Sequence, residues 1–168
     1  SPMIPLMFMG DEVNAKEPFL FFTDHHGELA EAVREGRRNE FADFAAFQDP
    51  ERRERIPDPN ALPTFQQSNP TFTDSEQAQF YRQLLSLRHR HLVPHLPGSV
   101  ALGAQVLADG AVTARWRLGN GSLLQIDLNL SATPVNHPAP EHLLFATPAE
   151  QGAQLPPYSA RVSLSPVG

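Results

Sequence analysis

Asp11 and Glu12 stand directly after the apolar run Met3–Met9, where a strand would deliver side chains able to do chemistry. Carboxylates act as nucleophiles, general acids or general bases when two of them converge on one reacting group. These two residues are adjacent, so at the end of a strand their side chains would point apart. Asp11 and Glu12 are therefore predicted to make hydrogen bonds rather than to form a catalytic pair.

The run Asp24-His25-His26 holds residue types that bind metal ions. Neutral imidazole is a common metal ligand, but the run lacks a third ligand at a suitable spacing. We therefore predict no metal site and no cofactor. A polar contact made at a cleft, or capping of the following helix by Asp24, is the favoured interpretation.

Composition excludes several classes of protein. The 168 residues are 40% hydrophobic and 19% charged, which is ordinary for a globular protein. The longest apolar run is far shorter than the roughly 20 residues of a membrane-spanning helix, and a net charge of −6 argues against a nucleic-acid partner. The absence of cysteine excludes disulfides and thiolate chemistry. We expect a cytoplasmic protein with no membrane partner and no nucleic-acid partner.

The start of the chain has the pattern of a strand that is buried on both faces. Met3–Met9 is apolar at every position except Pro5, as in the strands of a parallel sheet. Such a strand needs neighbours, and no second segment of this kind follows, so its sheet is predicted to come from residues before Ser1. The proline-rich stretch 49–73 is predicted to be a long ordered loop.

Two helices are predicted from apolar residues that recur at helical spacing. The first covers residues 28–47, with a break or bend at Gly36. The second covers residues 74–90 and is opened by a capping box, in which Thr73 caps the helix and Glu76 reaches back.

The tail of the chain is predicted to be a small antiparallel β domain, because short apolar runs alternate with glycine-bearing turns. The predicted strands are 100–107, 112–118, 123–130, 143–146 and 158–164. The fold class is therefore α/β plus β. Residues 1–94 are predicted to be the last strand-helix unit of a (β/α)8 TIM barrel, and residues 95–168 a C-terminal β-sandwich domain.

Several strings of residues resemble one group of enzymes. Pro5–Glu12 resembles the eighth barrel strand of the alpha-amylase clan, and Phe80–Arg90 resembles the eighth barrel helix of that clan. Between them, Pro18–His25 and Glu31–Phe41, with Pro57–Pro59, are similar to malto-oligosyltrehalose trehalohydrolase. Enzymes of that family free trehalose from the end of a glucan chain. The resemblance is specific in the front half of the chain and general in the β tail.

This resemblance implies a retaining glycosidase, with a carboxylate nucleophile and a carboxylic acid roughly 5 Å apart and a further aspartate that steadies the sugar. The family carries these groups on its fourth, fifth and seventh barrel strands, so they are expected upstream of Ser1. The chain alone is expected to be inactive. Asp11, Glu12, Asp24 and His25 are the candidates for contacting a maltooligosaccharide substrate at the rim of the cleft. For Asp11 and Glu12, hydrogen bonds within their own loops are an equally open alternative.

Two other functions stay open at this point. One is another enzyme of the clan, such as a glucan branching enzyme, and the other is a non-catalytic carbohydrate-binding module. Phe19, Phe21 and Phe22 could stack on a sugar ring, and so could Trp116, but a place in the core is the more usual role of such side chains. The predicted macromolecular partner is the upstream barrel of the same protein.

Overall fold

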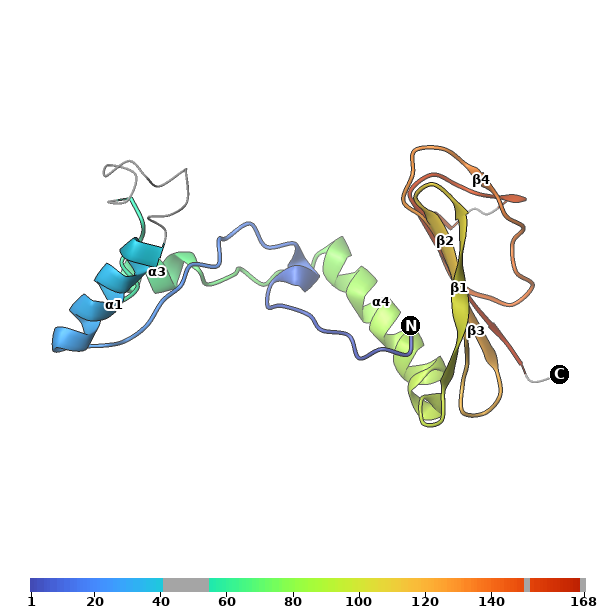
Figure 1. Cartoon of the computed structure of the whole chain (residues 1–168), viewed down its shortest axis with the longest axis horizontal. Coiled ribbons are helices and arrows are strands. Elements are labelled where there is room, and N and C mark those ends of the chain that lie inside the picture. The colour runs from blue at the N-terminus through green and yellow to red at the C-terminus, as the bar shows by residue number, and fades with distance from the viewer. Residues whose placement is uncertain (41–54, 150–151, 167–168) are drawn as a thin grey trace. The chain divides into compact units, whose positions relative to one another are not determined.

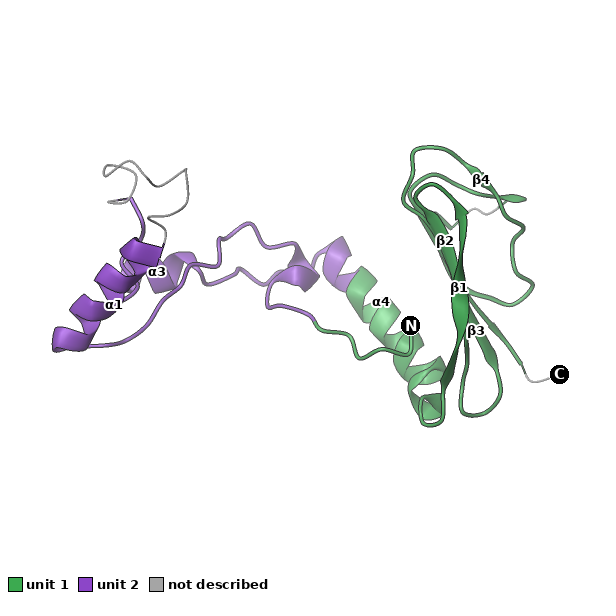
Figure 2. Cartoon of the chain, viewed as in Figure 1, with its two compact units in different colours: residues 1–6, 80–168 green, residues 7–79 purple. Residues whose placement is uncertain are grey.

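The computed structural model describes residues 1–40, 55–149 and 152–166, which fall into two compact units (Figures 1 and 2). Unit 1 comprises Ser1–Leu6 and Phe80–Gly168, and unit 2 comprises Met7–Gln79. Within the described residues, the clusters of buried apolar side chains lie in unit 1. The domain boundary predicted at residues 94 and 95 concerns the longer protein and stays a prediction.

Unit 1 is built on a five-stranded antiparallel sheet with the strand order β1-β2-β3-β7-β5, and β4 pairs separately with β6. The antiparallel β domain predicted from the sequence is confirmed, and its description as a sandwich stays a prediction. The two strands that the prediction missed, β4 and β6, are only two residues long, too short for a periodic pattern. The strands are β1 (Val100–Ala108), β2 (Ala111–Arg117), β3 (Leu123–Asn129), β4 (Val135–Asn136), β5 (Leu143–Thr147), β6 (Gln154–Leu155) and β7 (Ser159–Ser165).

Two tight turns connect the first three strands, and glycine is required in both. Gly110 has a φ of 72° between β1 and β2, and Gly121 has a φ of 86° between β2 and β3. Residues with a side chain rarely adopt this left-handed region, which is why Asp-Gly and Asn-Gly are hairpin signals.

Unit 1 has two apolar clusters, one on each face of the sheet. One comprises Ala111, Val135 and Leu155. The other lies on the face that carries Trp116. Leu118 and Leu124 are almost completely buried, and Leu92 from the end of the helical region packs with them. Trp116 and other partly buried side chains pack against this cluster. The core role predicted for Trp116 is therefore confirmed.

The opposite face of the sheet carries buried polar residues. Thr113, Asp127 and Arg161 stand opposite one another on β2, β3 and β7. The Arg161 guanidinium donates to the His137 carbonyl at 3.0 Å and to the Gln154 carbonyl. These carbonyls belong to the residue after β4 and to β6, so buried hydrogen bonds fasten this ribbon to the sheet.

Helix α4 (Glu76–His91) confirms the second predicted helix, but its cap differs from the prediction. The Ala78 N–H donates to Ser75 Oγ at 3.1 Å, so Ser75 caps the helix instead of Thr73. A short 3-10 turn, η3 (Val93–His95), follows α4. No helix in the described parts of the chain is long and apolar enough to cross a membrane.

Unit 2 contains a 3-10 turn, η1 (Asp11–Val13), and the helices α1 (Gly27–Glu40) and α3 (Leu62–Gln67). Helix α1 continues through Gly36, so of the predicted break or bend the break is wrong and the bend stays a prediction. Residues 41–47 of the predicted helix lie outside the described part. Helix α3 corrects the prediction of a loop without elements over 49–73. Pro63 stands in its first turn, where a missing N–H costs no hydrogen bond.

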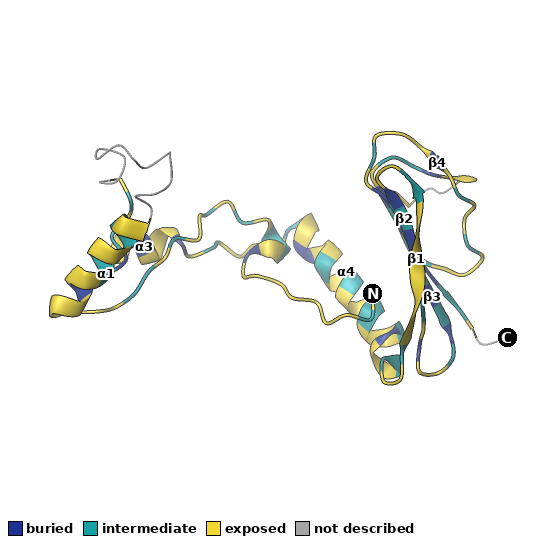
Figure 3. Cartoon of the chain, in the orientation of Figure 1, coloured by how far each residue is buried: buried dark blue, intermediate teal, exposed yellow. Residues whose placement is uncertain are grey.

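The predicted strand Met3–Met9 is not formed in this chain. These residues are irregular and exposed, with Ile4 90% and Leu6 99% accessible (Figure 3). A strand is held by hydrogen bonds to a neighbouring strand, and the described residues place none beside this segment. The antiparallel β domain is thus present, while the barrel part of the predicted fold class is not seen here.

Candidate functional site

The carboxylates of Asp11 and Glu12 both accept hydrogen bonds from backbone N–H groups of their own loop. Asp11 Oδ2 accepts from Phe8 at 2.9 Å, and Glu12 Oε2 accepts from Gly10 at 3.1 Å. Gly10 has a φ of 95°, and a Cβ there would lie 2.8 Å from Ala15 Cβ, so the turn requires glycine. The structure therefore shows the local role that the sequence left open, and contact of either residue with a sugar stays a prediction.

Asn60 fastens residues 23–25 to helix α1. Its Oδ1 accepts hydrogen bonds from Thr23 Oγ1 at 2.8 Å and from the His25 N–H at 2.9 Å. Its Nδ2 donates to the Ala30 carbonyl of α1 at 3.3 Å. One side chain thus connects segments that are 30 or more residues apart in sequence.

An ion pair between Asp58 and Arg34 joins the loop that carries Asn60 to α1. Asp58 Oδ2 accepts from Arg34 Nε at 2.8 Å and lies 2.7 Å from Nη2. The hydrogen bond from Arg34 is the main cause that lowers the pKa of Asp58, and the Asn60 N–H at 3.0 Å lowers this pKa further. Asp58 is therefore ionised at neutral pH and acts as an anchor of the loop.

Phenylalanine rings in unit 2 form a series of edge-to-face contacts. The ring centroids are 4.8 Å apart for Phe8 and Phe19, 6.1 Å for Phe19 and Phe22, and 5.2 Å for Phe22 and Phe65. Phe19 is 59% exposed and Phe21 is 46% exposed. A core role for these two rings is therefore wrong within this chain, because the described residues leave about half or more of each ring exposed.

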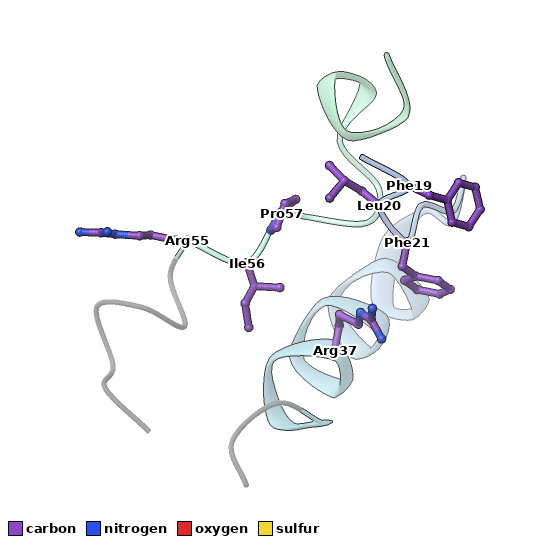
Figure 4. A pocket seen from close by; sticks show the side chains of 7 residues that line it. All are labelled: Phe19, Leu20, Phe21, Arg37, Arg55, Ile56 and Pro57. Carbon is purple, nitrogen blue, oxygen red and sulfur yellow. The ribbon is translucent and has the colours of Figure 1, made fainter. Parts of the chain in front are cut away.

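One cavity, of about 270 Å³, is lined by Phe19 and Phe21 together with other residues of unit 2 (Figure 4). Arg37 of α1 points toward the Phe21 ring, and its guanidinium carbon is 5.0 Å from the ring centroid. Arg37 also forms a 2.6 Å ion pair with Glu40. The other lining residues, Leu20, Arg55, Ile56 and Pro57, add no hydrogen-bond-accepting side chain. The side chains that line this cavity therefore offer a ligand apolar surface and two cationic groups, of which Arg37 is already paired with Glu40.

A second cavity, of about 480 Å³, combines apolar and polar groups, and we name it the α3 pocket. The side chains of Thr23 and Asn60 are hydrogen-bonded to each other. The Asp24 carboxylate, in contrast, makes no hydrogen bond or ion pair within residues 1–40, 55–149 and 152–166. Phe21 and Phe22 line different cavities. The lining includes Phe22, Thr23, Asp24, Asn60, Leu62 and Phe65.

The predicted site residues are brought together only in part. Asp24 lines the α3 pocket, and His25 follows it, held through its backbone N–H rather than through its imidazole. Helix α1 begins at Gly27, and Asp24 makes no capping hydrogen bond in the described structure. Among the described residues, no group of three or more His, Asp or Glu could hold a metal ion.

Sequence reasoning missed Asn60 and Phe65, because both fall in the stretch that was predicted to be a long ordered loop, and no residue of that loop was singled out. A signal for Phe65 was present, since Pro63 within Leu62–Gln67 is typical of the first turn of a helix. No local signal marks Asn60, whose three partners are 30 or more residues distant in sequence.

Comparison with known proteins gives consistent results. A family described as a domain of unknown function, DUF3459, matches residues 100–162, which are most of the β domain. The malto-oligosyltrehalose trehalohydrolase of Deinococcus radiodurans is 34% identical over 92% of this chain and 27% of its own length. The same-named enzyme of Rhizobium sp. (strain M-11) is 35% identical over 96% of the chain and 28% of its length. The enzyme of Mycobacterium tuberculosis is 32% identical over 87% of the chain and 25% of its length.

Among solved structures, a crystal structure from Salmonella typhimurium assigned as an alpha amylase is 43% identical, with a TM-score of 0.76. That match covers 96% of this chain and 28% of the solved chain. This chain therefore spans about a quarter of the length of the relatives that it matches.

Proposed function

We propose that this chain is the C-terminal part of a longer glycoside hydrolase of the alpha-amylase clan. Its resemblance to malto-oligosyltrehalose trehalohydrolase is confirmed over 92% of its length. The reaction proposed for the longer protein is hydrolysis of the α-1,4 bond next to the terminal trehalose unit of malto-oligosyltrehalose. The observation that carries the proposal is the 32–35% identity to same-named enzymes of three organisms. The absence of cysteine is compatible with a cytoplasmic place for this reaction.

Exposed apolar side chains support a longer protein. Met3 is 72% exposed, Ile4 90% and Leu6 99%, which is unusual for a contiguous apolar segment of a soluble protein. We propose that Met3–Met9 pairs with other strands of a barrel in the longer protein, as its eighth strand. The pairing would supply the backbone hydrogen bonds and the apolar cover that this segment lacks here.

The proposed reaction is a double displacement. One carboxylate attacks the anomeric carbon while a carboxylic acid about 5 Å away protonates the leaving oxygen, and water then cleaves the glycosyl-enzyme bond. We place both groups, and the aspartate that steadies the sugar, before Ser1. Asp11 and Glu12 are adjacent in the chain, and each accepts a hydrogen bond from a different N–H group of their own loop, so we do not propose them as that pair.

This chain is proposed to contribute contacts to the maltooligosaccharide at the rim of the cleft. The candidates are Asp11 and Glu12, which follow the proposed barrel strand, and Asp24 and His25, which follow the phenylalanines. Asp24 has the strongest support, because its carboxylate is exposed, lines a cavity and is not engaged by other described residues.

A second function is favoured by one observation. The Salmonella typhimurium protein that is assigned as an alpha amylase is 43% identical, a higher identity than that of the three trehalohydrolases. Hydrolysis of internal α-1,4 bonds of a glucan is therefore the second candidate for the longer protein.

The products of the reaction distinguish the two functions. The longer protein is incubated with malto-oligosyltrehalose and, separately, with maltopentaose, and the released sugars are separated by chromatography. We expect trehalose from the first substrate and little cleavage of the second. Glucose and maltose from maltopentaose, without trehalose from the first substrate, would instead establish an amylase. The 168-residue chain alone is expected to release no sugar from either substrate.

A further inference from the structure

We propose that the α3 pocket binds a glucosyl residue of an α-glucan. In this site Phe65 and Leu62 supply exposed apolar lining, which we name the apolar floor, and Asp24 supplies a carboxylate. The inference rests on the proposed function for the identity of the sugar. It adds a subsite formed by α3 and residues 22–24, separate from the proposed barrel strand.

The floor of the pocket is apolar and open to ligand. Leu62 is 64% exposed and Phe65 is 48% exposed, while Phe22 is half-buried and supports Phe65 edge-to-face at 5.2 Å. One face of a glucopyranose ring consists of C–H groups, which stack on an aromatic ring because both surfaces are thereby removed from water. A supported but exposed ring is suited to this contact.

The Asp24 carboxylate decides which kind of ligand fits. It has no partner among the described residues, so covering it with apolar protein would leave an ionised group buried and unpaired, which is costly. Sugar hydroxyls satisfy a carboxylate by charge-assisted hydrogen bonds. The apolar floor together with one anionic acceptor favours a neutral polyol and disfavours a phosphate or a carboxylate ligand.

The pocket is held in shape without a ligand. Thr23 Oγ1 donates to Asn60 Oδ1 at 2.8 Å, and Asn60 Nδ2 donates to the Ala30 carbonyl at 3.3 Å, so these polar groups are already paired. A site that is formed in advance loses less conformational entropy on binding. The cavity of about 480 Å³ lies within the range of small-molecule sites, about 300–1,000 Å³.

The test is a calorimetric titration of the 168-residue chain with maltopentaose. Phe65→Ala removes the stacking surface and Asp24→Asn removes the charged acceptor, and each is expected to weaken binding about tenfold. Phe65→Trp keeps an aromatic surface and is expected to retain binding. Phe72→Ala, at a ring 58% exposed outside the pocket, and Glu35→Gln, at an exposed site on α1, are matched controls expected to bind like the unchanged chain.

All the altered side chains are exposed, so the variants are expected to keep the circular dichroism of the unchanged chain. The inference is overturned if the chain binds no maltopentaose at millimolar concentration, or if Phe65→Ala and Asp24→Asn titrate like the two controls. Trehalose release by the longer protein is measured separately. A protein that releases trehalose while its Phe65→Ala variant keeps full affinity contradicts the subsite alone. A protein that binds glucan here and releases no trehalose contradicts only the proposed reaction.

Discussion

Arg161 is the side chain whose removal is expected to destabilise the β domain most. It is completely buried on β7, and its guanidinium donates to carbonyls of the β4-β6 ribbon. Its cross-strand neighbour Asp127 is 1% exposed and accepts hydrogen bonds from Thr113 at 2.7 Å and Gln125 at 3.0 Å. Burial lowers the pKa of Arg161, and the Asp127 carboxylate opposes this shift.

The magnitude follows from what Arg161→Leu leaves behind. The substitution removes the positive charge opposite a buried carboxylate and leaves two carbonyls without a donor. Loss of the charge that faces a buried carboxylate across the strands costs up to about 3–5 kcal/mol in free energy of unfolding, the cost of breaking a buried ion pair. The His137 imidazole, whose Nε2 lies 3.2 Å from Asp127 Oδ1, stays beside the carboxylate in the variant. In the double variant Arg161→Leu with Asp127→Asn, no charge is left uncompensated, while the Thr113 hydroxyl keeps an acceptor. The double variant is therefore expected to be more stable than the single one.

Urea unfolding of the chain, followed by the fluorescence of its single tryptophan on β2, measures both variants. With a slope of about 2 kcal/mol per molar urea, the midpoint for Arg161→Leu is expected to fall by about 2 M. A loss below about 1 kcal/mol would refute the reasoning. So would a double variant that is less stable than the single one.

Four further changes have defined outcomes. Gly119→Ala is expected to disrupt the β domain, because a Cβ there would lie 1.8 Å from the Pro97 carbonyl oxygen. Gly36→Ala meets nothing within 4 Å and is expected to stabilise α1 by about 0.5–1 kcal/mol. A thermal unfolding midpoint that shifts in the same direction for both variants would contradict this. Leu124→Ala creates a cavity in the core and is expected to lower the free energy of unfolding in urea by about 2–5 kcal/mol. A loss below about 1 kcal/mol would contradict this and would mean that neighbouring side chains relax to fill the cavity. The pKa of Asp58 is lowered from its ordinary value of 3.8, so its ion pair with Arg34 stabilises the fold above pH 3.8. This stabilisation is lost as the pH falls through the pKa of Asp58 in the folded state. An NMR titration that gives a pKa of 3.8 or higher for Asp58 would be the contrary result.

The β domain was predictable from the sequence because its signals are local. Alternating apolar residues and the glycines of two hairpin turns fix five of its strands. The polar face was not predictable. Asp127 and Arg161 are 34 positions apart in the chain and become neighbours only through the pairing of β3 with β7. Their burial therefore depends on topology rather than on any local pattern.

The candidate site was predictable only in part, for a similar reason. Asp24 and the phenylalanines stand in one short run, and the structure places them at two cavities. The residue that positions them, Asn60, acts across 30 or more positions. Met3–Met9 failed as a predicted strand because its partners are not among the described residues, and a strand cannot form without them.

The central claim is that this chain is the C-terminal part of a longer glycoside hydrolase, and the sequence that precedes Ser1 in the gene tests it most directly. We predict seven further strand-helix units, with an aspartate, a glutamate and an Asn-His-Asp run at the ends of strands. A natural chain that begins near Ser1, or an upstream region without those acidic residues, would contradict the claim.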